Sequence, residues 1–129
     1  MRRAQEKLFK GRALYAEHIG EIGEHTAEVF LAANGYTVVA RNAAFRYGEI
    51  DRVVSDGRYL VFVEVKTRAK GAQVAGEEAV DARKQEKLRA AAALWLQQNP
   101  TELQPRFDVI VVEHDERDVR VTRHIQNAF

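Results

Sequence analysis

Two apolar, β-rich segments in the middle of this chain carry charged residues where a buried sheet is expected. Residues 49–55 and 59–67 are separated by a short polar break at Asp56-Gly57. Asp-Gly is a favoured two-residue turn, so the two segments are predicted to pair as a β-hairpin. A buried charge is costly unless it is paired or holds a metal. The charges in this hairpin therefore predict a chemical function for this part of the chain.

The expected hairpin register brings these charges together. With a two-residue turn at the break, Asp51 lies opposite Phe62 and diagonal to Glu64, while Glu49 lies opposite Glu64. Side chains alternate along a strand, so Asp51, Glu64 and Lys66 are predicted to share one face. Diagonal neighbours are about 7–8 Å apart, so two carboxylates can reach one ion between them.

A carboxylate pair with a neighbouring lysine suits metal-dependent cleavage of a phosphodiester. The two carboxylates would repel one another without a cation, and oxygen ligands favour Mg²⁺ or Mn²⁺ over zinc. Lys66 is placed to stabilise a pentavalent phosphorane or to help deprotonate the attacking water. The alternative is structural: Glu64 and Lys66 pair with each other and Asp51 caps a turn. The apolar surroundings of all three residues favour the functional interpretation.

Composition bounds the class of protein. The chain has 129 residues, 46% hydrophobic and 30% charged, which predicts a single folded domain. A net charge of +1 supports no nucleic-acid binding by itself. The absence of cysteine excludes disulfides and thiolate metal sites and is compatible with the reducing cytoplasm, where we expect the protein. No apolar run has the length of a membrane span, so we expect neither a signal peptide nor a membrane partner.

The expected element order is α-β-β-β-α-β-β. A helix between two strands implies at least one parallel pairing, so we expect an α/β fold with a mixed sheet flanked by helices. Basic residues at 1–12 predict an N-terminal arm or a first helical turn. The expected helices span 13–34 and 81–98, the strands span 36–41, 49–55, 59–67, 107–113 and 119–125, and residues 68–80 are expected to form a loop.

The first helix carries an acidic stripe beside a stripe of small residues. Most of the glutamates are expected to face solvent, where like charges cost about 0.2–0.5 kcal/mol per pair. The small residues would let the helix approach the sheet closely, which makes Glu24 the best candidate to reach inward and Glu28 the second. The stripes are Glu17, Glu21, Glu24 and Glu28, and Gly20, Gly23 and Ala27.

The second helix begins with cations, which oppose the helix dipole unless an anion docks there. These are Arg83, Lys84 and Lys87, after the expected N-cap Asp81. A phosphate backbone is the natural anion. The equally weighted alternative is a solvated face paired with Glu77, Glu78 and Glu86. Arg68 adds basic charge in the loop after Lys66, and Trp95 is expected in the core rather than as a base-stacking platform.

Several short motifs in the middle of the chain belong together. They are Gly20-x-x-Gly23-Glu24-x-x-Ala27, Asn34-Gly35-Tyr36, Arg41-Asn42, Gly48-Glu49-Ile50-Asp51, Val61-Phe62-Val63-Glu64-Val65-Lys66-Thr67-Arg68, Lys84 and Arg106-Phe107-Asp108-Val109. Over residues 20–113 this set resembles the YraN family of bacterial proteins, within the PD-(D/E)XK, restriction-endonuclease-like nuclease superfamily. The resemblance implies an α-β-β-β-α-β core.

The resemblance also implies roles for individual residues. The sequence is similar to archaeal Holliday-junction resolvases, in which a glutamate of the first helix joins the metal ligands. By that pattern Asp51 and Glu64 are metal ligands, Glu24 is a third or water-mediated ligand, and Lys66 is the catalytic lysine. Arg52 departs from the pattern, because the family usually has an aliphatic residue there. Strand parity places Arg52 on the face opposite the site, where the departure affects packing more than chemistry.

These expectations lead to a Mg²⁺- or Mn²⁺-dependent endonuclease acting on DNA, including branched or structured DNA. Arg68, Lys84 and Lys87 would contact phosphates. The second interpretation is a nucleic-acid-binding module with weak or no catalysis that works with a partner protein, and the third is a protein–protein scaffold. A homodimer would supply two sites for cutting two strands, and residues 119–125 resemble an edge strand that could form its contact.

Overall fold

The computed structural model describes residues 12–72 and 80–129, with side chains from His18 onwards. The predicted order of elements is confirmed, and the chain forms an α/β fold with a restriction-endonuclease-like core. The elements are α2 (Arg12–Ala33), β1 (Thr37–Phe45), β2 (Gly48–Ser55), β3 (Tyr59–Ala69), α3 (Ala82–Gln98), β4 (Gln104–His114) and β5 (Val119–Ile125).

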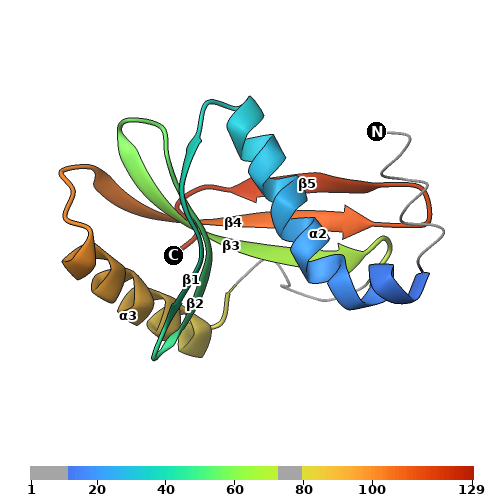
Figure 1. Ribbon diagram of the computed structural model, residues 1–129, viewed down its shortest axis with the longest axis horizontal. Helices are drawn as coiled ribbons and strands as arrows, with labels where there is room; N and C mark the ends of the chain where they lie inside the picture. Colours follow the sequence, from blue (N-terminus) through green and yellow to red (C-terminus); the bar gives the residue numbers. More distant parts are fainter. Residues whose placement is uncertain (1–11, 73–79) are drawn as a thin grey trace.

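The five strands form one mixed sheet in the order β1-β2-β3-β4-β5. The pair β3–β4 is parallel, as the intervening α3 requires, and the other pairs are antiparallel. Strand β5 is an edge strand, as the sequence predicts. Figure 1 shows α2 lying across β3, β4 and β5, while α3 lies beside the β1–β2 hairpin.

The core has two main parts, one on each side of the sheet, because alternate residues of the central strands face opposite helices. Val61 and Val63 of β3 pack with α2 residues Ala27 and Leu31. On the other side Leu60 and Phe62 pack with α3, and the ring of Trp95 meets that of Phe62 edge to face with centroids 5.9 Å apart. Trp95 is therefore a core residue, as predicted.

The turn between β2 and β3 differs from the prediction. Val53 pairs with Phe62 and Ser55 pairs with Leu60, so the connection has four residues rather than two. The side chain of Asp56 explains the longer connection, because its Oδ1 accepts hydrogen bonds from the backbone N–H groups of Arg58 and Tyr59. The predicted pairing of Asp51 with Phe62 is wrong by two residues, which preserves the face on which Asp51 lies.

Helix α2 approaches the sheet at one of the predicted small residues. A β-carbon at Gly23 would overlap the side chain of Thr67 on β3, and Ala27 is fully buried. The prediction is wrong for Gly20, around which there is open space. Close contact at Gly23 fixes the height of Glu24, the next residue, above the sheet.

Several expectations concern element ends. Asp81 caps α3 as predicted, because its Oδ1 accepts a hydrogen bond from the N–H of Lys84 at 2.8 Å. Arg68 lies in β3 rather than in a loop. The predicted basic arm, apart from Arg12 at the start of α2, and most of the predicted loop at 68–80 fall outside the described residues. Neither helix of the described ranges is long and apolar enough to cross a membrane.

Candidate active site

Asp51 lies where β2 and β3 separate. The last backbone pair between the two strands joins Arg52 to Val63. One residue beyond it, Oδ2 of Asp51 accepts a hydrogen bond from the backbone N–H of Val65 at 2.8 Å. The carboxylate thus bonds an N–H on the β2 side of β3, beyond the last backbone pair of these two strands, while β4 pairs with the other edge of β3. This bond holds Asp51 beside Glu64, as the sequence predicts, although through a different register.

The environment of Asp51 disfavours its negative charge. Burial raises the pKa of Asp51 to about 7, and the neighbouring charges of Glu64 and Glu49 act in the same direction. The hydrogen bond from Val65 opposes them without cancelling them. Near neutral pH the site therefore favours binding a proton or a cation between Asp51 and Glu64.

Asp51, Glu64 and Glu49 form a carboxylate cluster, and Glu24 reaches it from helix α2. Burial raises the pKa of Glu24, and the charge of Asp51 adds to the increase. Oε1 of Glu24 accepts a hydrogen bond from Nδ2 of Asn42 at 2.8 Å and lies 3.4 Å from Nη1 of Arg52. Glu21, by contrast, is largely exposed beside His18. Of these two glutamates in the acidic stripe, Glu24 is the one that turns inward, as the sequence predicts.

Asn42 connects two of the carboxylates, a role that sequence reasoning missed. Its Nδ2 lies 2.8 Å from Glu24 Oε1 and 2.9 Å from Glu49 Oε1. The backbone of Asn42 is left-handed, with φ of 45°, and asparagine tolerates this conformation better than most residues. The sequence offers two signals, the Arg41-Asn42 motif and an asparagine directly after the expected strand 36–41, because asparagine is rare within strands. The second signal indicates a backbone irregularity but not its partners.

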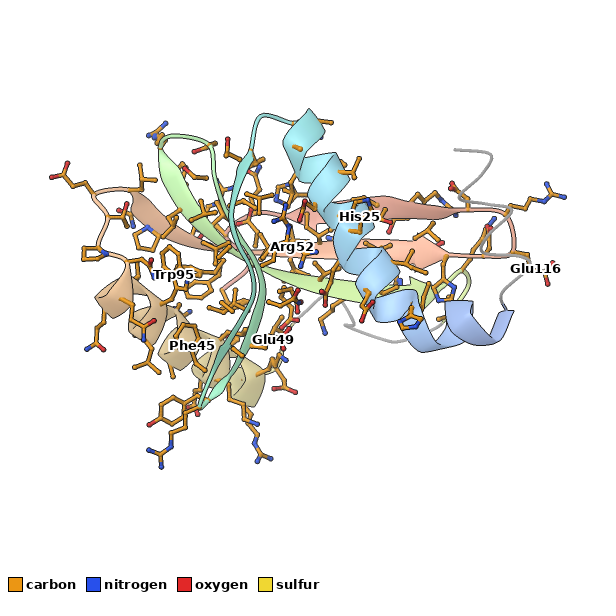
Figure 2. The ribbon with its side chains drawn as sticks, viewed as in Figure 1. His25, Phe45, Glu49, Arg52, Trp95 and Glu116 are labelled. Atoms are coloured by element: carbon orange, nitrogen blue, oxygen red, sulfur yellow. The ribbon has the colours of Figure 1, made fainter. Side chains whose placement is uncertain are left out.

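Arg52 explains how the departure from the family pattern is accommodated. Its side chain is buried against α2, on the face that parity predicts, and Nε lies 2.8 Å from Oε1 of Glu28. Nη1 also donates to the backbone carbonyl of Asp51 at 2.7 Å. Figure 2 shows Arg52 between the hairpin and α2. The guanidinium thus supports both the helix carrying Glu24 and the backbone carrying Asp51.

Glu28 holds a second arginine of the same network. Nε of Arg41 lies 2.7 Å from Oε1 of Glu28. The hydrogen bond from Arg41, supported by Arg52, lowers the pKa of Glu28 to about 2 despite its partial burial. Glu28 is therefore a structural anion rather than a member of the carboxylate cluster.

The predicted basic residues have different surroundings. Nζ of Lys84 lies 3.5 Å from Oε2 of Glu64, so α3 places a cation directly at the carboxylates. Nη2 of Arg68 lies 3.9 Å from Oε2 of Glu113 on β4. Lys87 is exposed, and Lys66 is partly buried two residues beyond Glu64 on the same face of β3. Lys84 and Lys66 are thus near the cluster, and Arg68 is held by the sheet.

The donor set fits a hard divalent cation that keeps part of its water shell. Oε2 of Glu64 is buried and has no hydrogen-bond partner among the described residues, although Nζ of Lys84 lies at ion-pair distance. No three histidine or acidic side chains within the described ranges form a complete metal-binding group. Mg²⁺ is commonly bound by one or two carboxylates with water in the remaining positions. Asp51 and Glu64 are the residues that would hold the ion, and Glu24 would be a third or water-mediated ligand.

Comparison with known proteins identifies the family. The model of the uncharacterised protein family UPF0102 matches residues 23–112. A UPF0102 protein of Symbiobacterium thermophilum is 47% identical over 88% of this chain and 98% of its own length. Similar proteins of Chlorobium phaeobacteroides and Frankia casuarinae are each 41% identical over 86% of this chain, and the match covers 93% and 95% of their lengths.

The chain belongs to the UPF0102 family. This confirms the resemblance to the YraN family, which is the same family. The UPF0102 match includes every residue of the carboxylate cluster, from Glu24 to Glu64, as well as Lys66 and Lys84. It ends within β4, two residues before the end of that strand. The names of the UPF0102 relatives state no activity, so the function has to be argued from the site.

Proposed function

We propose that this UPF0102 protein is a divalent-metal-dependent endonuclease that hydrolyses phosphodiester bonds in DNA, including branched or structured DNA. One observation carries the proposal. Asp51 and Glu64 are held together at the end of a strand pairing, where burial and mutual repulsion raise the pKa of Asp51 to about 7. Such an arrangement lowers stability unless a cation binds there, and strongly perturbed groups are typical of functional sites.

Each neighbouring residue would have a distinct part in hydrolysis. A bound Mg²⁺ or Mn²⁺ would neutralise Asp51 and Glu64 and act as a Lewis acid on the phosphate. Lys66, on the same face as Glu64, would stabilise the charge of the pentavalent phosphorus as an ammonium, or help remove the proton of the attacking water as a neutral amine. Asn42 and Arg52 orient Glu24 toward the cluster. Lys84, Lys87 and Arg68 would contact backbone phosphates.

A second function is favoured by Lys84. Its Nζ, 3.5 Å from Glu64 Oε2, already supplies a positive charge at the place where a metal is expected. If this ion pair persists with DNA bound, the protein is a nucleic-acid-binding module with weak or no catalysis, acting with a partner protein. Its affinity for DNA would then fall steeply with salt and be insensitive to chelators and to Asp51→Ala.

Cleavage of a labelled substrate panel separates the two functions. The panel contains duplex, single-stranded, flap and four-way-junction DNA, and RNA, each with Mg²⁺, Mn²⁺ or EDTA. The variant is Glu64→Gln, which removes a charge while keeping the shape of the side chain. Glu116→Gln is the matched control, because Glu116 lies in the turn between β4 and β5, at the far end of the sheet (Figure 2).

The nuclease proposal expects metal-dependent cleavage by wild type and Glu116→Gln, and a loss of at least about a hundredfold in Glu64→Gln, as is usual when a group that acts on the transition state is removed. Cleavage by Glu64→Gln at the wild-type rate would overturn it. Binding of DNA without cleavage in any metal, unchanged in Glu64→Gln, would instead establish the binding module.

A further inference from the structure

The tip of the β1–β2 hairpin exposes an aromatic ring. Arg46 and Tyr47 form the two-residue connection between Phe45 and Gly48, which pair across the hairpin. Tyr47 is 49% exposed, one of three large hydrophobic side chains that are exposed among the described residues. The guanidinium carbon of Arg46 lies 5.8 Å from the centroid of the Tyr47 ring. The tip thus presents a cation and an aromatic ring together.

The base of the hairpin is firmly packed. Phe45 and Ile50, on either side of the tip, both belong to the hydrophobic cluster that contains Trp95 of α3. Figure 1 shows the tip of the hairpin beside the start of α3 and projecting away from the other three strands, and Figure 2 shows Phe45 on the α3 side. An exposed ring on a rigid support loses little conformational entropy on binding a ligand, which favours recognition.

A line of positive charge connects the tip to the carboxylate cluster. A β-carbon at Gly48 would lie 3.9 Å from the β-carbon of Lys87 on α3. Lys84 is one helical turn away from Lys87 on the same face of the helix. Nζ of Lys84 in turn lies 3.5 Å from Oε2 of Glu64. Gly48 at the tip, then Lys87, Lys84 and Glu64, therefore follow one another from the tip of the hairpin to the carboxylate cluster.

This surface matches the two chemical features of an unpaired nucleic-acid strand. Its bases have exposed π faces, which stack on aromatic side chains irrespective of sequence, and its phosphates bind lysine. The cations at the start of α3 oppose the helix dipole, an arrangement that an anion would relieve. An uninterrupted duplex offers the phosphates but buries the faces of its bases, so the tyrosine distinguishes the two forms.

We propose that Tyr47 stacks on an unpaired base of DNA while Lys87 and Lys84 bind the backbone between that base and the carboxylate cluster. The inference deepens the proposed function, because it assigns the substrate class: DNA with unpaired nucleotides next to a duplex, as in flaps, tails and junctions. The guanidinium of Arg46 lies over one face of the ring, and the base would stack on the other.

The test measures binding in EDTA, where cleavage is absent. Fluorescence anisotropy compares a blunt duplex with the same duplex carrying a single-stranded tail. The variants are Tyr47→Ala and Tyr47→Phe, with Val39→Ala as the control because Val39 is an exposed hydrophobic residue of the same hairpin, at 47% exposure. A 2-aminopurine in the tail reports stacking directly by quenching.

Tyr47→Ala is expected to weaken binding of the tailed DNA about tenfold, within the range found for loss of one stacked base, and to abolish quenching. Its affinity for the blunt duplex should stay within about twofold. Tyr47→Phe should bind and quench like wild type, because it keeps the aromatic face, and Val39→Ala should be unchanged. Lys87→Ala should weaken binding of both DNAs and reduce the salt dependence of binding.

Equal losses for both DNAs in Tyr47→Ala, no loss for either, or no binding of tailed DNA by wild type would overturn this inference. The outcome is separable from that of the nuclease proposal. If wild-type protein cleaves DNA but Tyr47→Ala binds tailed DNA as tightly as wild type, the nuclease proposal stands and the stacking role of Tyr47 is refuted. If wild-type protein quenches 2-aminopurine and Tyr47→Ala does not, but no DNA is cleaved with any metal, the stacking role stands and the nuclease proposal is refuted.

Discussion

Asp51 has partners with opposite effects on its charge. The N–H of Val65 stabilises the carboxylate, whereas burial and the charge of Glu64 destabilise it, and the second effect is the larger. The folded protein therefore retains a proton on Asp51 at pH values where the unfolded chain has released it. Because the native state binds more protons over this interval, its stability decreases as the pH increases.

In EDTA we expect the contribution of Asp51 to the free energy of unfolding to decrease as the pH rises from about 4 to about 7, because only the folded state holds its proton over this range. The slope of this contribution is at most about 1.4 kcal/mol per pH unit, the limit for one proton. Asp51→Asn removes it, because asparagine does not titrate and its side-chain oxygen can still accept the Val65 hydrogen bond. Urea unfolding of both proteins at a series of pH values measures the difference. Equal slopes would contradict the assigned pKa.

Lys84 offers a second prediction at the scale of single residues. Because its Nζ pairs with Glu64, a metal ion has to displace it, and Lys84→Met should tighten Mn²⁺ binding. The pair is half exposed on the lysine side, so it is worth about 0.2–1 kcal/mol, or up to about fivefold in affinity. Titration calorimetry with Mn²⁺ provides the measurement, and Lys87→Met is the control. Weaker Mn²⁺ binding in Lys84→Met would show that the lysine assists the metal.

Helix α2 shows how an element sets the geometry of the site. Gly23 touches Thr67 and Ala27 is buried, while Gly20 faces open space. Two glycines of one helix thus differ only in what surrounds them. The helix can lie at its present height above β3 only because residue 23 has no side chain, and this height places Glu24 at the cluster.

Gly23→Ala and Gly20→Ala are therefore expected to have opposite effects on stability. Gly23→Ala forces the helix away from Thr67 and should destabilise the fold by about 1–3 kcal/mol. Gly20→Ala should stabilise it by about 0.5–1 kcal/mol, because alanine favours a helix over glycine. Thermal or urea unfolding tests both. A Gly23→Ala/Thr67→Ala double variant should recover part of the loss, and no recovery would assign the cost to another contact.

The elements also differ in how far the sequence determines them. Helix α3 could be placed closely, because Asp81 caps it and Asn99-Pro100 ends it, both through local chemistry. The turn at Asp56 was predicted with the wrong length, because the side chain of Asp56 bonds the backbone N–H groups of Arg58 and Tyr59 and so brings both residues into the connection. Asn42 was also beyond prediction, because its partners depend on the pairing of β1 with β2, which includes a register shift after Val38. Asp51 and Glu64 could be placed on one face because strand parity survives a shift of two residues, and Glu24 because the small residues beside it in α2 let the helix approach the sheet.

At the scale of the whole molecule, a second charged centre joins segments that are far apart in the sequence. Asp108 of β4 is fully buried, and its Oδ2 lies 2.8 Å from Nη2 of Arg106 and 2.7 Å from Nε2 of His124 on β5. The same Nη2 donates to the hydroxyl of Tyr36, and the N–H of Asn127 donates to Oδ1. Burial raises the pKa of Asp108, but these hydrogen bonds outweigh it and the net pKa is lowered. The centre thus connects the segment after α2 with β4, β5 and the C-terminal residues.

Asp108→Asn should destabilise the protein by about 3 kcal/mol, because it leaves the partly buried Arg106 without its counter-charge. The control Glu102→Gln, on an exposed loop, should change stability by less than about 0.5 kcal/mol. Urea unfolding gives both values. Mn²⁺ affinity at the carboxylate cluster should remain unchanged in Asp108→Asn at temperatures where it is folded, and a large change in affinity would show that the two centres are coupled.

The parallel pairing of β3 with β4 has a consequence for synthesis on the ribosome. Every residue of β3 from Tyr59 to Ala69 pairs with β4, yet residues 70–103 must be made before β4 begins. At about 5–20 residues per second, that interval lasts roughly two to seven seconds. For a delay of this length after β3 leaves the ribosome, the nascent chain exposes one edge of this apolar strand, an aggregation hazard that ends only when β4 arrives. A pause in translation after β3 has left the ribosome and before β4 has done so should therefore lower the yield of folded protein.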